Sequence, residues 1–253
     1  MDTSKPVIFY DVLSGPPLRP YAINPWRTRF ALNAKQLHYR TEWVDFTEIE
    51  TVRKRLGVAP VAKNPDGSEL YTLPMIHDQA NSVLLGDSFE IAVYLDKKYQ
   101  NSGLSLFPDS ASVELARTVH RIIDTHFRQF FGLLAMGMPL PPETVKVATA
   151  EFARRAGVEK WEDLWFEGEL RVQKLAEFRD ACESVAKLYK VNEDGTQGPF
   201  FEGRTSPVYA DLIVAGWMRT LKSDLREWED FTMWQGGLWG RVYSETEKFA
   251  QAK

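Results

Sequence analysis

Leu73-Pro74-Met75-Ile76 is a short apolar, strand-like run, and Leu84-Leu85-Gly86-Asp87-Ser88 follows it at the start of a helical pattern. A proline beside such a run cannot donate a ladder hydrogen bond, so it fits a central strand badly and a cis-proline turn well. A turn of this kind leaves backbone groups of Leu73 available to an extended ligand. Asp87 and Ser88 offer a carboxylate, a hydroxyl and the N–H groups of a helix start, which can hold an amino-acid-like head group. The two stretches predict one site that binds a small peptide at both ends.

Each stretch also has a purely structural interpretation. Most X–Pro bonds are trans, and Asp87 or Ser88 can be a simple N-cap. Glu90 would then complete a pattern resembling a capping box. The order of strand, proline turn, strand, glycine, cap and amphipathic helix favours the binding interpretation over capping alone.

The composition is that of a folded protein. The chain has 253 residues, of which 44% are hydrophobic and 13% aromatic, enough for two domains with real cores. Its net charge is −4 and it has no basic run, so we expect no nucleic-acid partner. It lacks an apolar run of the ~20 residues that a membrane span needs, and its N-terminus lacks an apolar signal region. We therefore expect a cytoplasmic protein that does not associate with membranes.

Cysteine and histidine usage argues against metal and disulfide chemistry. The chain has a single cysteine, Cys182, which excludes internal disulfides and zinc sites built on paired cysteines. Four scattered histidines do not compensate for that deficit, so we expect no metal. Cys182 lies in an amphipathic pattern and is expected to be a packing residue.

The first ninety-odd residues alternate strand and helix patterns. Asn24 is expected to cap the first helix, with Pro25 at its first helical position, and Pro65-Asp66-Gly67 marks a turn inside a loop over 62–69. The order β-α-β-α-β-β-α over 5–99 is that of a thioredoxin-like domain. The predicted strands are 7–12, 39–44, 75–77 and 83–85, and the predicted helices are 24–33, 48–56 and the run that follows Asp87.

After a turn-rich boundary at 100–110 the pattern becomes helical. We predict an α/β domain over 1–100 and an all-α domain over 101–253, with a further boundary at 192–199. Asp211 is expected to accept backbone N–H groups at the start of a buried helix and so to support folding rather than chemistry. The predicted helical segments are 112–136, 142–156, 161–190 and 209–221, and the aromatic run 126–136 is expected to be one helix.

Together these features resemble the cytosolic glutathione transferase superfamily, and in appearance most of all its fungal etherase-related, β-etherase-like class. The resemblance implies that glutathione is the co-substrate, that Leu73 before cis-Pro74 meets its cysteine backbone, and that Asp87 and Ser88 meet its γ-glutamyl group. It also implies a thioredoxin-like glutathione-binding domain, an all-helical domain that completes a hydrophobic ligand site, and a homodimer.

The region before Trp26 departs from the family pattern. The run 26–29 resembles helix one of Ser-type and Cys-type relatives, in which the Ser or Cys lies two to four residues before the tryptophan. Here Ala22, Ile23 and Asn24 occupy those positions. Lowering a thiol pKa from ~8.5 by two units takes ~2.7 kcal/mol, which one charge-assisted hydrogen bond and a helix N-terminus can supply. Asn24 is the best remaining donor and the candidate catalytic residue; its alternative role is that of a pure N-cap.

Two functions from different classes follow. The first is a detoxifying glutathione transferase acting on hydrophobic, aromatic electrophiles, with β-etherase-type activity as one form. The second is a non-catalytic ligandin, which the missing Ser, Tyr or Cys favours, whereas the intact Leu73-Pro74 and Asp87-Ser88 pairs keep the first ahead. Tyr21 and Ile23, together with the aromatic run 126–136, favour an apolar second ligand in either case.

Overall fold

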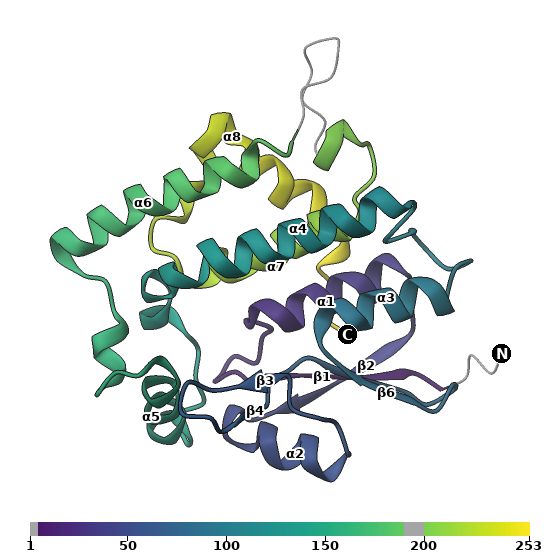
Figure 1. Ribbon diagram of the computed structural model, residues 1–253, viewed down its shortest axis with the longest axis horizontal. Coiled ribbons are helices and arrows are strands. Elements are labelled where there is room, and N and C mark those ends of the chain that lie inside the picture. Colours follow the sequence, from purple (N-terminus) through teal and green to yellow (C-terminus); the bar gives the residue numbers. More distant parts are fainter. Residues whose placement is uncertain (1–4, 190–199) are drawn as a thin grey trace. The chain divides into compact units, whose positions relative to one another are not determined.

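The computed structural model describes residues 5–189 and 200–253, which pack into two compact units (Figure 1). Within the described residues, the first unit comprises 5–104, 139–164 and 252–253, and the second comprises 105–138, 165–189 and 200–251. The boundary predicted at 192–199 and the end of the helix predicted to reach Lys190 lie outside the described residues.

The first unit is built on a four-stranded mixed sheet with the order β2-β1-β5-β6. Strands β1 (Val7–Val12) and β2 (Tyr39–Val44) are parallel, and β5 (Met75–Asp78) pairs antiparallel with both β1 and β6 (Val83–Gly86). Helices α1 (Ile23–Ala34) and α3 (Ser88–Lys98) cover one face, and α2 (Ile49–Arg55) covers the other (Figure 1). Helices on both faces bury β1 almost throughout, which explains why its sequence is a continuous apolar run rather than an alternating one. This arrangement confirms the thioredoxin-like prediction.

Two short strands in this unit escaped prediction. The segment expected to be a loop contains a hairpin of β3 (Ala62–Lys63) and β4 (Glu69–Leu70), joined by the expected turn with Gly67 at φ 85°. Strands of this length are too short to show an alternating pattern, so periodicity cannot detect them.

Residues 139–164 pack with the first unit, although their helical pattern predicts membership in the helical domain. They contain α5 (Val145–Ala156) and a 3₁₀ turn, η4 (Trp161–Leu164). The Phe152 ring stacks on Phe46 with 4.2 Å between ring centroids; Phe46 opens the short 3₁₀ turn η1 (Phe46–Glu48) before α2. Long-range packing of this kind leaves no trace in local periodicity.

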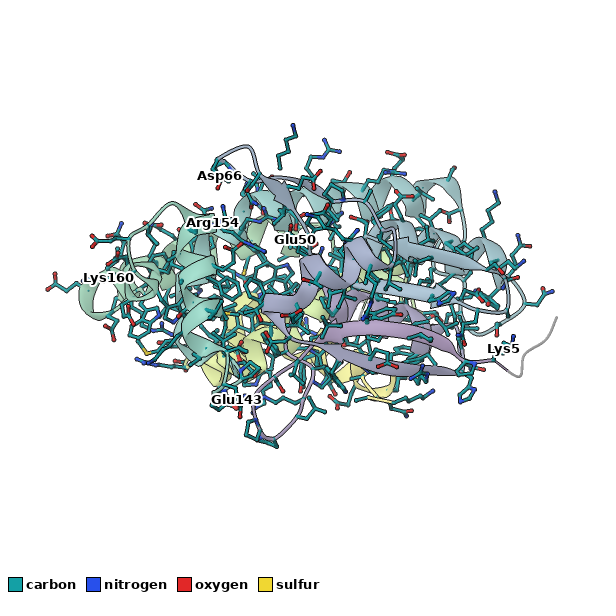
Figure 2. The ribbon with its side chains drawn as sticks, turned by 90° about the horizontal axis from the view of Figure 1, so that it is seen from below. Lys5, Glu50, Asp66, Glu143, Arg154 and Lys160 are labelled. Carbon is teal, nitrogen blue, oxygen red and sulfur yellow. The ribbon has the colours of Figure 1, made fainter. Side chains whose placement is uncertain are left out.

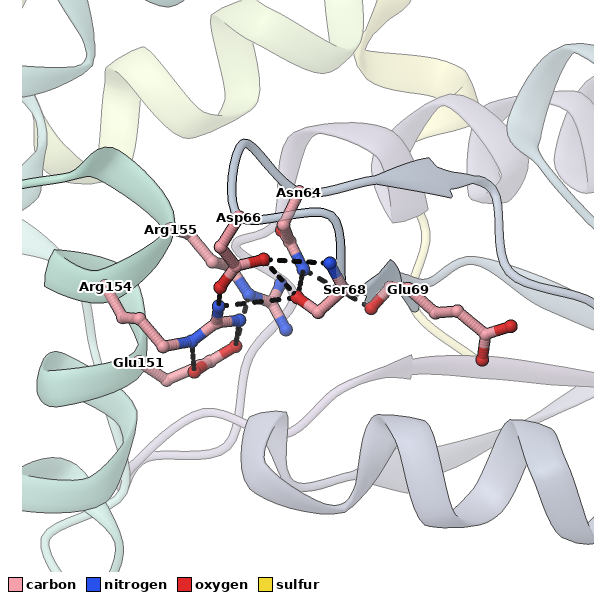
Figure 3. A network of polar contacts seen from close by, with 7 residues as sticks. All are labelled: Asn64, Asp66, Ser68, Glu69, Glu151, Arg154 and Arg155. Atoms are coloured by element: carbon pink, nitrogen blue, oxygen red, sulfur yellow. Dashed lines mark hydrogen bonds and ion pairs between the residues drawn. The ribbon is translucent and has the colours of Figure 1, made fainter.

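A polar network joins α5 to the β3–β4 turn. Arg154 contacts Asp66, and the two labelled side chains lie side by side in Figure 2. Figure 3 shows that Asp66 also accepts hydrogen bonds from the backbone N–H and the hydroxyl of Ser68, at 2.9 and 2.6 Å. Glu151 accepts from Arg154 Nε and Arg155 Nε, each at 2.7 Å. The hydrogen bonds from Arg154 are the largest reason that the pKa of Glu151 falls to about 2.

The second unit is helical, as predicted. Its central helix α7 (Tyr209–Asp224) is buried along nearly its whole length and packs against α4 (Ser110–His126). The other helices and 3₁₀ turns are α6 (Gly168–Ala186), α8 (Trp228–Thr246), η2 (Arg128–Leu133), η3 (Ala135–Gly137), η5 (Phe201–Gly203) and η6 (Glu247–Phe249). The sequence did not predict α8, whose helical geometry is interrupted over 234–237, where Gly236 and Gly237 have positive φ.

The expectation of one helix over 126–136 is wrong. The α-helix ends at His126, and the chain continues in tighter turns whose N–H groups reach back three residues, as from Phe130 to Phe127. Phe127 and Phe130 are both buried, and Phe127 packs edge-on against Phe178 and Trp217. These core contacts, together with a glycine in the middle of the run, favour a 3₁₀ path over a regular helix.

Candidate functional site

Strand register brings the two motifs together at one end of a hairpin. Met75 of β5 pairs with Gly86 of β6, so Pro74 and Asp87 continue the two chains from the same paired position. Tyr10 of β1 also pairs with Met75, which brings the carboxyl end of β1 to this edge. The loop that leads into α1 starts there. The β5–β6 hairpin thus assembles the predicted peptide-binding ends, because antiparallel neighbours lie only ~5 Å apart.

The peptide bond between Leu73 and Pro74 is cis, as predicted. Both residues are buried, and the bond turns the backbone directly before β5. Proline is the residue that makes a cis bond accessible, since the trans preference of an X–Pro bond is only ~0.5–1 kcal/mol.

The start of α3 combines a cap with an unusual backbone conformation. Asp87 is the N-cap and has φ 87°, a value that costs free energy for a residue with a side chain. Its Oδ1 accepts hydrogen bonds from the N–H groups of Phe89 and Glu90, at 2.8 and 3.1 Å. Over the described parts of the chain, the second oxygen, Oδ2, has no hydrogen-bond partner. Asp87 therefore caps the helix with one oxygen only, while Ser88 opens the helix and is buried.

The start of α1 differs from the prediction. The N-cap is Ala22, whose carbonyl accepts from the Trp26 N–H at 3.1 Å, so the expectation that Asn24 caps the helix is wrong. The helix begins two residues earlier because Pro25 fits anywhere in the first turn, where no N–H is needed. Asn24 is the second helical residue and is half-buried. Within 5–189 and 200–253, no side chain caps this helix and no hydrogen bond engages the Asn24 side chain.

Tyr21 and Ile23, which were predicted to favour an apolar ligand, and Ser14, in the loop before α1, have different surroundings. Ile23 is half-buried, whereas Tyr21 is buried. Ser14 is also buried, and its hydroxyl donates to the Gly15 carbonyl at 3.0 Å and accepts from the Arg19 N–H at 2.8 Å. These bonds commit the Ser14 hydroxyl to its own loop.

Helix α1 is held on the sheet by an ion pair that the sequence analysis did not single out. Arg29 Nη2 lies 2.7 Å from Asp11 Oδ2, and both side chains are completely buried. The Arg29 guanidinium also lies over the rings of Phe9 and Trp43, at 4.9 and 5.5 Å from their centroids. The sequence shows only a basic residue within the helical pattern over 24–33, because its partner, Asp11, comes from another element.

The described residues also bear on the predictions about metal ligands, the cysteine and membrane-spanning helices. No group of three or more His, Cys, Asp or Glu side chains in this part of the chain is arranged to hold a metal ion. Cys182 lies in the second unit, and burial raises the pKa of its thiol well above the ordinary value, which agrees with a packing role. No described helix is both long and apolar enough to cross a bilayer.

Comparison with known proteins agrees with this geometry. The N-terminal domain model of glutathione S-transferases matches residues 21–98, and the C-terminal domain model matches residues 119–249. A comparison with curated protein sequences found no match.

Three solved fungal structures resemble the whole chain. A glutathione S-transferase of Ceriporiopsis subvermispora, solved in complex with glutathione, has 30% sequence identity and a TM-score of 0.86 over 98% of this chain and 99% of its own. A second from that fungus, also in complex with glutathione, has 28% identity and a TM-score of 0.84 over 96% and 98%. A glutathione transferase of Phanerochaete chrysosporium has 25% identity and a TM-score of 0.86 over 98% and 99%. Because the C-terminal domain model alone spans more than half of this chain and the 30% identical relative covers almost all of it, the chain belongs to the glutathione S-transferase family.

Proposed function

We propose that this protein binds glutathione in its first unit and transfers it to hydrophobic, aromatic electrophiles. The observation that carries the proposal is the cis Leu73–Pro74 bond beside the Asp87–Ser88 helix start, joined by the Met75–Gly86 pair. Leu73 would pair with the backbone of the glutathione cysteine. The open oxygen of Asp87 would receive the γ-glutamyl ammonium, and Ser88 would hold the neighbouring carboxylate at the helix N-terminus.

In this arrangement the sulfur lies near the start of α1. Stabilising its thiolate would fall to the Asn24 side-chain amide and to the first N–H groups of the helix, which have no side-chain cap within the described residues. The hydrogen bond would favour the thiolate directly, and the positive end of the helix dipole would add to it. The thiolate then attacks the electrophilic carbon of the substrate, and the leaving group departs with the electron pair of the bond that breaks.

Substitution of Asn24 tests the catalytic assignment. Asn24→Ala should slow conjugation of a chlorinated nitrobenzene and raise the pH at which half of the bound glutathione is thiolate, because the donor to the sulfur is lost. Asn101→Ala is the matched control, since Asn101 is an exposed asparagine of the same unit. Equal rates and equal thiolate pKa values in wild type and Asn24→Ala would exclude this role for Asn24.

The second candidate is a ligandin that keeps glutathione affinity without turnover. It is favoured by the residues at 22–24, none of which carries the hydroxyl or thiol usual in the resembling classes. Measurable glutathione binding with no conjugation of any tested electrophile would select this alternative.

The apolar second ligand rests on Ile23 and on the family resemblance. Tyr21, Phe127 and Phe130 are buried, so their aromatic character does not by itself support a ligand surface. Displacement of a fluorescent apolar dye by phenolic ethers would test for this ligand. The homodimer expected from the resemblance would be tested by sedimentation of the purified protein.

A further inference from the structure

Arg53 is an anomaly on helix α2. It is 2% exposed, whereas its neighbours Lys54 and Arg55 point into solvent, as basic side chains on a short surface helix normally do. Burying a guanidinium costs free energy unless its donors are satisfied, so a buried arginine needs specific partners. The partners of the Arg53 guanidinium therefore indicate its structural role.

The guanidinium donates hydrogen bonds to the backbone before and after the β3–β4 hairpin. Nη1 donates to the carbonyl of Thr72 and Nη2 donates to the carbonyl of Ala59, each at 2.5 Å. Thr72 directly precedes the cis Leu73–Pro74 bond. One charged side chain therefore fixes the segment between β4 and the cis-proline turn to the residues that precede β3, through two charge-assisted hydrogen bonds.

The same guanidinium lies against the other end of the predicted site. A methyl group added to Gly86 would come within 2.6 Å of Arg53 Nη2 and 3.0 Å of its Cζ. Gly86 has an ordinary backbone conformation, so glycine is required here for space and not for a positive φ. Gly86 directly precedes Asp87, whose negative charge lies close enough to oppose the lowering of the Arg53 pKa that burial causes.

We propose that Arg53 is a positioning residue for glutathione binding, which rests on the proposed function. Through Thr72 it holds the cis-proline turn and through Gly86 it supports the Asp87 helix start, so it sets the separation of the two ends that grasp the peptide. Lysine cannot replace it, because an ammonium lacks both the planar face that lies on Gly86 and the two-pronged fork that reaches two carbonyls.

The first test compares substitutions on one helix. Arg53→Met should weaken glutathione binding, measured by calorimetry, by about tenfold or more, because the hydrogen bonds it removes are charge-assisted. Arg53→Lys should recover little of that loss. Arg55→Met removes the same charge from an exposed position two residues along and should leave the dissociation constant unchanged. If the wild type binds glutathione and Arg53→Met binds it with the same affinity, the inference is overturned. If the wild type does not bind glutathione, the proposed function is refuted instead.

A second test separates positioning from general stability. Tyr99→Phe removes a hydrogen bond to Asp78 Oδ2 elsewhere in the same unit and serves as a destabilised control. In steady-state kinetics, Arg53→Met should raise the KM for glutathione and leave kcat at saturating glutathione unchanged, while Tyr99→Phe should change neither. Equal increases in KM for the two variants would show that Arg53 acts only through stability and would overturn the inference.

The Gly86 contact gives a test that does not depend on removing the arginine. Gly86→Ala should weaken glutathione binding, because the new methyl displaces the guanidinium. In the presence of Arg53→Met, the same change should cost little more, since a flexible thioether replaces the rigid planar group. If the two effects are additive, or if Gly86→Ala binds as tightly as the wild type, the guanidinium does not couple the two ends.

Discussion

The starts of α3 and α1 belong to the same unit but are built in opposite ways. At α3, Asp87 accepts two backbone N–H groups and adopts a strained φ of 87°. At α1, the N-cap is Ala22, the first turn has no acidic residue, and among the described side chains none caps the helix. In the proposed function the two helix starts would have different roles: α3 would present a negative group to a cation, and the positive end of α1 would face an anion such as a thiolate.

A third helix start gives a purely structural reference for this comparison. At α7, Asp211 is completely buried, and its two oxygens accept from the N–H groups of Phe201 and Val208, at 2.9 and 2.8 Å. Unlike Asp87, it uses both oxygens to accept backbone N–H groups. The expectation that Asp211 supports folding agrees with these contacts.

The largest effect on stability should come from removing the Asp211 carboxyl at the start of α7. Asp211→Ala leaves two buried N–H groups without an acceptor and should lower the free energy of unfolding by roughly 2–6 kcal/mol. Chemical denaturation followed by fluorescence measures the change. If Asp211→Ala is as stable as the wild type, the buried carboxyl does not anchor α7.

Burial also gives Asp211 a characteristic pH dependence. It raises the pKa of this carboxyl from 3.8 to about 7, so the folded state binds a proton more tightly than the unfolded state does. The contribution of Asp211 to stability should therefore be greatest below pH 4 and fall as the pH rises to about 7. The stability difference between wild type and Asp211→Asn, measured across this range, isolates the effect. A difference that stays constant with pH would contradict it.

At α3, one substitution separates the cap from the charge. Asp87→Asn keeps an N-cap acceptor and a residue that tolerates positive φ, so stability should change little. Glutathione affinity should fall by roughly tenfold or more, because a charge-assisted hydrogen bond to the γ-glutamyl ammonium is worth about 1.5–3 kcal/mol. Calorimetry and thermal unfolding report the two quantities separately. A loss of stability with unchanged affinity would reduce Asp87 to a cap.

A smaller loss of affinity should follow Ser88→Ala. The substitution removes the Ser88 hydroxyl, which would hydrogen-bond to the γ-glutamyl carboxylate, and should weaken glutathione binding by about five- to tenfold. Ser102→Ala, in the same unit and outside the predicted site, is the control, and it should bind like the wild type. Unchanged calorimetric affinity in Ser88→Ala would contradict the assignment of this hydroxyl to the ligand.

The smallest effect should come from giving α1 the cap that it lacks. Ala22→Ser supplies a side-chain acceptor for the Asn24 N–H, since Pro25 at the next position has no N–H, and should stabilise the protein by about 0.5–2 kcal/mol. The rise in melting temperature, measured without glutathione, checks this prediction. If stability does not change, the N–H groups of α1 are already satisfied, and the contrast between the two helix starts disappears.

Prediction from sequence succeeded where an element is long and its pattern is local. The strands 7–12 and 39–44 were predicted to the residue, and the cis bond at Pro74 followed from a proline that could not sit in a central strand. The two-residue strands β3 and β4, the interrupted helix α8 and the 3₁₀ path after His126 were missed or misassigned. In each of these, contacts from distant residues or special backbone angles outweigh local preference.

The residues predicted for the site have a local sequence signature, whereas the residue that supports them is recognised only by its long-range contacts. Asp87 and Ser88 can be predicted from the sequence because a helix start has a sequence signature. Arg53 looks like any surface base of a polar helix, and only its burial against Gly86 and its bonds to two distant carbonyls set it apart. Asn24 shows the converse, because a good capping residue does not cap when the helix begins at Ile23.

The sequence by itself determined the α/β and helical organisation, the proline turn and the helix start that follows it, because these depend on local hydrogen-bonding chemistry and apolar spacing. Tertiary structure alone decided that β5–β6 pairing places Pro74 beside Asp87, that residues 139–164 pack with the first unit, and that Arg53 lies against Gly86 and donates to the Thr72 carbonyl. Those outcomes depend on which distant segments share one core, and a buried charge finds its partners only after the chain has folded around it.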